Sequence, residues 1–147
     1  MFGMNLAVGK GESLGNELVA NPAFSVNVND VGTYNTSVSH VDSSCRIEIT
    51  DTYVPATRHY LTSDKIVGKT YLQKVSIKSP KAFDLQTYNG DAYVFMSTVI
   101  GDNIYHNYEV AFEVVDTLTE DQAYFRLDDL LVGDVVYFDN VSIKQIL

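Results

Sequence analysis

Apolar and polar residues alternate with a period of two along most of this chain, which is the pattern of β-strands that bury one face. Residues 107–116 show it clearly, with Val110, Phe112 and Val114 set between polar and acidic residues. Similar short segments occur at 16–26, 36–50, 69–79, 83–89, 91–100, 123–133 and 134–145. Helix-like patterns are almost absent between them, so the sequence predicts an all-β protein rather than a parallel α/β fold.

Turn signals separate these segments at intervals of about 8–12 residues. The strongest is Asn89-Gly90, which lies between two strand-like runs and predicts a β-hairpin. The spacing as a whole predicts an antiparallel β-sandwich, or jelly roll, of about eight strands. At 147 residues the chain has the length of one domain and can bury a core without disulfide bonds.

Residues 119–131 fit two structures. Thr119 and Gln122 have the spacing of a helix capping box, and apolar residues recur after them at helical intervals. Phe125 and Leu127, with the residues that alternate with them, fit a strand equally well. An adjacent aromatic pair and the strand-rich surroundings favour the strand.

The charge balance excludes several classes of partner. The chain carries 19 acidic and 10 basic residues, which gives a net charge of −9 at pH 7. A protein that follows a nucleic-acid backbone or binds an anionic membrane surface needs the opposite sign, so we expect neither partner. The acidity serves solubility or complements a cationic or metal-bearing partner.

The first 16 residues differ from the rest, since they hold four glycines and show weak periodicity. They predict an N-terminal arm at 1–16 ahead of a sandwich domain at 17–147. The arm either frays or docks on a neighbouring subunit. It lacks the basic region and unbroken apolar run of a secretion signal, and no segment approaches the ~18 apolar residues of a membrane span, so we expect a cytoplasmic site of synthesis.

No constellation of residues predicts an enzyme. Asp128 and Asp129 are adjacent, and neighbours on a strand point to opposite faces, so one of them is expected to pair with Arg126 rather than to form a hydrolytic carboxylate pair. The three histidines lie far apart, and nucleophile and phosphate-loop motifs are absent. The single cysteine, Cys45, alternates with isoleucines and predicts a small buried hydrophobe.

Tyrosines are the best candidates for ligand contacts. Tyr88 and Tyr93 bracket the predicted hairpin, while Tyr105, His106 and Tyr108 cluster before a predicted strand. Tyrosine rings stack on sugar faces, and their hydroxyl groups bond sugar hydroxyls. The competing interpretation is that these are ordinary sheet or interface tyrosines.

Three stretches carry a family resemblance: NELVANPAF at 16–24, IVGKTYLQKVSIK at 66–78 and VVYFDNVSIKQ at 135–145. In this order and spacing they resemble carbohydrate-binding modules of the four/nine group, which are galactose-binding-like jelly rolls. The resemblance covers residues 16–147 and implies a non-catalytic binding fold. The chain departs from the pattern in having no Trp, because the family reads sugars largely through Trp and Tyr platforms.

The resemblance also implies a structural calcium ion, held between an acidic residue of the first stretch and the aspartate of the last. Asp139 occupies the second position, but Ser25 stands at the first, and calcium prefers 6–8 oxygen ligands. Asp139 is therefore a candidate calcium ligand, and we expect no other cofactor. We expect Asp139 and Asn140 to face opposite ways, with Asp139 accepting hydrogen bonds from backbone N–H groups near residues 21–25 and so clasping the last strand to the first.

A looser resemblance concerns domain context rather than motifs. Modules of this kind recur in tailed-phage virions as decoration or tail proteins, and a lone module with a glycine-rich arm resembles those. We therefore predict a virion structural protein, assembled in the host cytoplasm, that contacts other virion proteins and itself in a trimer or other homo-oligomer. The alternative is a glycan-binding module that uses surface tyrosines.

Overall fold

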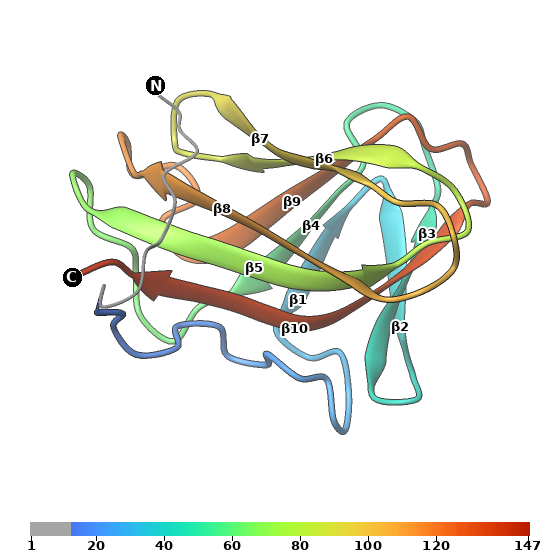
Figure 1. Ribbon diagram of the computed structural model, residues 1–147, viewed down its shortest axis with the longest axis horizontal. Coiled ribbons are helices and arrows are strands. Elements are labelled where there is room, and N and C mark those ends of the chain that lie inside the picture. The colour runs from blue at the N-terminus through green and yellow to red at the C-terminus, as the bar shows by residue number, and fades with distance from the viewer. Residues whose placement is uncertain (1–12) are drawn as a thin grey trace.

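The computed structural model describes residues 13–147 as two five-stranded antiparallel sheets that pack face to face (Figure 1). The first sheet has the order β1 (Val31–Tyr34), β4 (Ala56–Tyr60), β9 (Gln122–Asp128), β6 (Phe83–Tyr88) and β7 (Tyr93–Val99). The second has the order β2 (Thr36–Val41), β3 (Ser44–Ile49), β10 (Val135–Gln145), β5 (Thr70–Lys78) and β8 (His106–Glu113). The predicted all-β sandwich is confirmed. The part of the predicted arm at 1–12 lies outside the described residues.

The core lies between the sheets and uses the inward positions of the predicted alternation. Cys45, Ile47 and Ile49 on β3 are fully buried, as are Phe125 and Leu127 on β9. Burial raises the pKa of the Cys45 thiol to about 12, so this side chain stays protonated and packs as the predicted small hydrophobe. Within 13–147 no helix is long and apolar enough to span a membrane.

His59 on β4 is a polar residue at the centre of the core. Its ring centroid lies 5.7 Å from that of Phe24, 5.4 Å from that of Phe125 and 6.0 Å from that of Phe138. Its Nε2 is 3.0 Å from the hydroxyl oxygen of Thr57, while Nδ1 has no partner among the described residues. Burial lowers the pKa of His59 to about 3, because a charged imidazole would lose its hydration here. The ring therefore packs as a neutral aromatic.

The alternation pattern does not predict two of the strands, β1 and β4, and one segment predicted as a single strand forms two. β1 and β4 are the two strands at one edge of the first sheet. The inward residues of β4 include the polar Thr57 and His59, so the sequence of β4 lacks the alternation of apolar and polar residues that marks a half-buried strand. The predicted strand at 36–50 is two strands, β2 and β3. Asp42 and Ser43 between them adopt φ of 48° and 59°, which reverses the chain.

The strand predicted near residues 123–133 and the hairpin are both present. Gln122–Asp128 is β9, in the centre of the first sheet, rather than a helix. The loop between β6 and β7 holds Asn89 and Gly90, and the Asn89 side-chain oxygen accepts hydrogen bonds from the N–H groups of Asp91 and Ala92 at 2.9 Å. Gly90 has φ of 101°, which favours glycine.

The Asp139-Asn140 pair is a β-bulge, and the predicted clasp at Asp139 is wrong. Asp139 pairs with Ser76 and Ser142 with Lys74, so β10 holds one extra residue, and Asn140 adopts φ of 49°. The residues on either side of the pair both point into the core. Asp139 and Asn140 therefore do not face opposite sides of the sheet, contrary to the prediction from the sequence. The Asp139 carboxylate accepts from the Asn140 N–H at 2.8 Å, and no bond joins it to residues 21–25.

Glu17 holds the two ends of the chain together in the way expected of Asp139. Residues 13–22 run along the second half of β10, beyond its pairing with β3 (Figure 1). The Glu17 carboxylate accepts from the N–H of Ile143 at 2.9 Å and from those of Leu18 and Val19 at 3.1 Å. The bulge also turns the Val141 N–H toward this segment, where it donates to the Pro22 carbonyl at 2.9 Å.

One buried amide joins the two sheets through the core. Gln73 on β5 is fully buried and donates to the main-chain carbonyl of Tyr124 on β9 at 2.9 Å. Its own oxygen accepts from the hydroxyl of Thr87 on β6 at 3.1 Å. The pairing of β6 with β9 covers only Asp84–Gln86 on the β6 side, so the amide satisfies a carbonyl that lies beyond this ladder.

Candidate functional site

The outward side of the first sheet carries aromatic and charged side chains from all five strands. We call it the tyrosine face. Strand alternation and register place these residues on it: Tyr34, Arg58, Tyr60, Asp84, Gln86, Tyr88, Tyr93, Phe95, Thr98, Tyr124, Arg126 and Asp128. Large residues at outward positions of a solvated sheet are unusual for stability alone, so this side of the sandwich is the candidate site.

Three tyrosines form the aromatic centre of the face. The ring centroids of Tyr88 and Tyr93 are 5.1 Å apart, and that of Tyr124 lies 6.1 Å from Tyr88 and 6.2 Å from Tyr93. Partial burial and the neighbouring Tyr93 raise the pKa of Tyr124, so its hydroxyl keeps its proton and can donate a hydrogen bond. Phe95 extends the aromatic surface along β7 and is 57% exposed.

A hydrogen-bonded triplet of Gln86, Arg126 and Asp128 borders these rings. Asp128 accepts hydrogen bonds from Arg126 Nε at 2.7 Å and from Gln86 Nε2 at 2.5 Å. The guanidinium carbon of Arg126 lies 4.6 Å from the ring centroid of Tyr93. The carboxylate thus fixes both donors beside the rings, which combines stacking surface with oriented hydrogen-bonding groups. The predicted pairing of Arg126 with one of the two adjacent aspartates is confirmed, and Asp128 is the partner.

Arg58 lies on the other side of Tyr124. It pairs in register with Tyr124 on β9 and with Gly32 on β1. A Cβ atom at Gly32 would come within 2.8 Å of the Tyr60 hydroxyl oxygen and 3.2 Å of Arg58 Nε and Nη2. The absence of a side chain at Gly32 therefore lets the guanidinium and this hydroxyl meet over β1.

The structure separates the five residues proposed from the sequence. Tyr88 and Tyr93 lie together on the tyrosine face. Tyr105 lies beside Lys78 of the second sheet, with Lys78 Nζ 5.4 Å from its ring centroid, and His106 Nε2 lies 2.9 Å from a carboxylate oxygen of Asp102.

Tyr108 requires a correction. Only 7% of this residue is exposed, and its hydroxyl accepts a hydrogen bond from the Ile100 N–H at 2.9 Å. Its inward position on β8 makes it part of the core rather than a surface for a ligand.

Tyr124, Arg126 and Asp128 belong to the candidate site, and the sequence reasoning did not propose them as ligand contacts. They alternate along β9 with the buried Ala123, Phe125 and Leu127. An aromatic, a cation and an acid at three successive outward positions were the available signal. Arg58 and Tyr34 gave less signal, because they come from the two strands that the alternation does not predict.

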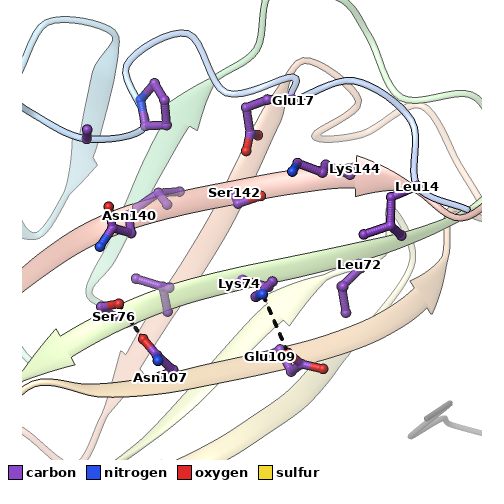
Figure 2. Close-up of a pocket in the computed structure, with 14 residues that line it drawn as sticks. Leu14, Glu17, Leu72, Lys74, Ser76, Asn107, Glu109, Asn140, Ser142 and Lys144 are labelled. Carbon is purple, nitrogen blue, oxygen red and sulfur yellow. Dashed lines mark hydrogen bonds and ion pairs between the residues drawn. The ribbon is translucent and has the colours of Figure 1, made fainter. Parts of the chain in front are cut away.

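The outer side of the second sheet holds a groove of about 550 Å³ between the N-terminal segment and strands β10, β5 and β8 (Figure 2). No aromatic side chain lines it. Figure 2 shows two pairs of its polar side chains in contact: Ser76 donates to Asn107 at 2.5 Å, and Lys74 lies 4.0 Å from Glu109. The groove therefore lacks the stacking surface of the tyrosine face.

Among residues 13–147 no group of three or more carboxylate, histidine or cysteine side chains, at Asp139 or elsewhere, is placed to hold a metal ion. The calcium ligand role of Asp139 stays a prediction, with Ser25 still standing at the position where an acidic partner was expected.

Solved structures of carbohydrate-binding modules share this fold. A family 29 carbohydrate-binding module from Piromyces equi superposes with a TM-score of 0.62 at 11% identity, covering 93% of this chain and 92% of that one. A variant of another family 29 module, complexed with cellulohexaose, gives a TM-score of 0.57 at 12% identity over 88% of this chain and 90% of that one. The apo module BiXyn10A CBM1 gives 0.62 at 14% identity over 90% and 98%.

Sequence comparisons add nothing to these neighbours. No family profile matches the chain, and no curated protein matches it. At 11% to 14% identity the neighbours establish the fold, a jelly roll of the carbohydrate-binding-module type. Two of these three structures are family 29 modules and the third is BiXyn10A CBM1, and none of them links the chain to a virion.

Proposed function

We propose that this protein is a non-catalytic glycan-binding module and that the tyrosine face is its binding surface. The observation that carries the proposal is the packing of Tyr88, Tyr93 and Tyr124 against a guanidinium that Asp128 holds in place. Aromatic rings cover the apolar C–H faces of a sugar, and charged or amide groups at fixed positions bond its hydroxyls. The shared fold of carbohydrate-binding modules supports the proposal.

The main competing interpretation is that these tyrosines only stabilise the sheet. Two of the rings argue against it, because Tyr93 is 39% exposed and Phe95 is 57% exposed on an edge strand. Exposed rings contribute little burial, so a purely structural role would not select them at these positions.

Calorimetric titration against soluble oligosaccharides tests the proposal. We expect binding by the wild-type protein and a loss of about tenfold or more for Tyr93→Ala, since one stacked ring is worth about 1–3 kcal/mol in comparable platforms. Tyr105→Ala is the matched control, because Tyr105 is 40% exposed but lies beside the second sheet. Equal losses in the two variants, or no binding to any oligosaccharide, would contradict the proposal.

The assembly role remains a separate prediction. A decoration or tail subunit in the virion would need a contact surface for copies of itself or other virion proteins, and the described part of the arm, residues 13–16, instead pairs with this chain's own β10. Light scattering and virion fractionation test it. A monomer that is absent from particles would contradict the assembly role and leave glycan binding standing.

A further inference from the structure

Arg58 is a cation without an acidic partner in the middle of the tyrosine face. The other arginine of the face, Arg126, is neutralised by Asp128 at 2.7 Å. Within residues 13–147 no carboxylate lies within salt-bridge distance of Arg58, although the protein carries 19 acidic residues against 10 basic ones. In so acidic a protein, a guanidinium left unpaired on a surface of exposed rings points to a charge supplied by a ligand.

The hydrogen-bonding groups of Arg58 are also largely unused. Its Nε is buried and has no partner among the described residues, and Nη2 donates one long bond of 3.4 Å to the Thr33 carbonyl. An unsatisfied buried donor costs free energy, and a guanidinium offers five N–H groups in a planar fork. Arg58 as a whole is half-buried, and its Nη1 is neither buried nor bonded within residues 13–147, so the outer end of the guanidinium is open to an acceptor with two oxygens.

The surroundings of Arg58 suit a sugar that carries such an acceptor. Tyr124 is its cross-strand neighbour, and the Tyr60 hydroxyl lies beside the guanidinium above Gly32. A ring stacked on Tyr124 could therefore direct a substituent toward Arg58, and the Tyr60 hydroxyl could donate to the same group.

We infer that the tyrosine face takes an acidic glycan, with the carboxylate of a uronic acid unit bound by Arg58; this rests on the glycan binding proposed above. A planar carboxylate matches the guanidinium fork with two parallel N–H···O bonds. The net charge of −9 repels polyanions at long range, so the preference arises from the local pairing and not from general attraction. Arg126 does not compete for the carboxylate, because Asp128 already occupies it.

Oligogalacturonides and oligomannuronates, each compared with its own methyl ester, provide the test. Esterification removes the charge and leaves the sugar rings unchanged. We expect the wild-type protein to bind an acid form about tenfold more tightly than its ester, as for hydrogen bonds to charged groups. Arg58→Gln should remove this preference, so that the acid form and its ester bind about equally. Arg46→Gln is the matched control, because Arg46 pairs with Glu48 on the second sheet.

A second variant separates the position of the guanidinium from its charge. Gly32→Ala keeps Arg58 but fills the space over which Nε and Nη2 lie, so it should reduce the preference for the acid form as well. Thermal melts of each variant check that the fold is retained.

The possible outcomes separate the two proposals. Binding of esters and neutral oligosaccharides as tightly as the acid forms, unchanged by Arg58→Gln, overturns the acidic-glycan inference and leaves glycan binding intact. A preference for sulfated over uronate oligosaccharides also overturns the assignment of a carboxylate. Failure to bind any acidic or neutral glycan overturns both.

Discussion

Glu17 Oε2 accepts a hydrogen bond from the Ile143 N–H at 2.9 Å, across 126 positions of the sequence. The same oxygen accepts from the Val19 N–H, so one carboxylate satisfies main-chain donors from both ends of the described chain. This contact closes the second sheet where β3 no longer pairs with β10.

Glu17→Ala should therefore lower the free energy of unfolding by about 2–3 kcal/mol, because it leaves main-chain donors without an acceptor. Urea unfolding measures the change. Two acidic residues serve as controls. Glu109→Ala, whose carboxylate is 4.0 Å from Lys74 on the surface, should cost less than about 0.5 kcal/mol. Asp139→Ala should lower the free energy of unfolding clearly less than Glu17→Ala does. The reverse order would show that Asp139, rather than Glu17, holds the two ends of the chain together.

The neutral His59 should make the protein sensitive to moderate acid. Its pKa is lowered to about 3 in the folded state, while the unfolded side chain titrates near 6.5. Unfolding then takes up a proton between these values, so stability is unaffected above pH ~6.5 and falls by about 1.4 kcal/mol per pH unit below it.

Urea unfolding at pH 6.5 and 4.5 measures this slope. His59→Gln should flatten it, since glutamine can still bond Thr57 but does not titrate. His106→Gln, which changes a half-exposed histidine beside Asp102, should leave the slope unchanged. A wild-type slope that survives in His59→Gln would show that other groups carry the acid sensitivity.

Gly90 should tolerate a side chain less well than Gly68, although both have φ near 90–100°. A Cβ at Gly90 would lie 2.5 Å from the Asp116 carbonyl oxygen, whereas nothing lies within 4 Å of one at Gly68. Gly68→Ala should cost about 1–2 kcal/mol from backbone strain alone. Gly90→Ala should cost about 3 kcal/mol or more, because main chain must also shift. Equal melting temperatures for the two variants would disprove the close packing of the hairpin on Asp116.

Asp128→Asn should reduce glycan affinity while changing stability little. Asparagine offers one acceptor oxygen, so Arg126 and Gln86 cannot both be held as the carboxylate holds them. We expect a loss of about tenfold in affinity, the value of one charged hydrogen bond, measured by calorimetry. Asp134→Asn breaks a comparable pair with Lys81, neither residue of which belongs to the tyrosine face, and should leave affinity intact. Unchanged affinity in Asp128→Asn would exclude the triplet from the binding surface.

The sequence predicts the fold where buried side chains are apolar. β3, β8 and β9 follow the alternation of their inward residues. β4 does not, because Thr57 and His59 take inward positions, where they bond each other and His59 packs among aromatic rings from elsewhere in the fold. The bulge at Asp139 is also accompanied by a contact that no local pattern encodes, the bond between Val141 and Pro22.

The candidate site was only partly predictable for a related reason. Tyr88 and Tyr93 are close in sequence because they flank one hairpin. Tyr124 joins them because β9 pairs with β6, and Arg58 joins through the pairing of β9 with β4; both registers are properties of the whole sheet. A period of two shows which residues face outward, but not which strands become neighbours.

The buried side-chain amide of Gln73 supports the tyrosine face from inside the sandwich, where no ligand can reach it. Tyr124 lies where β9 has left its ladder with β6, and its carbonyl is held from the opposite sheet. The 6.1 Å separation of the Tyr124 and Tyr88 rings therefore depends on a residue in the interior, which also holds Thr87 beside Tyr88. A substitution at position 73 would therefore change the width of the aromatic platform from the interior, without altering any residue on the surface.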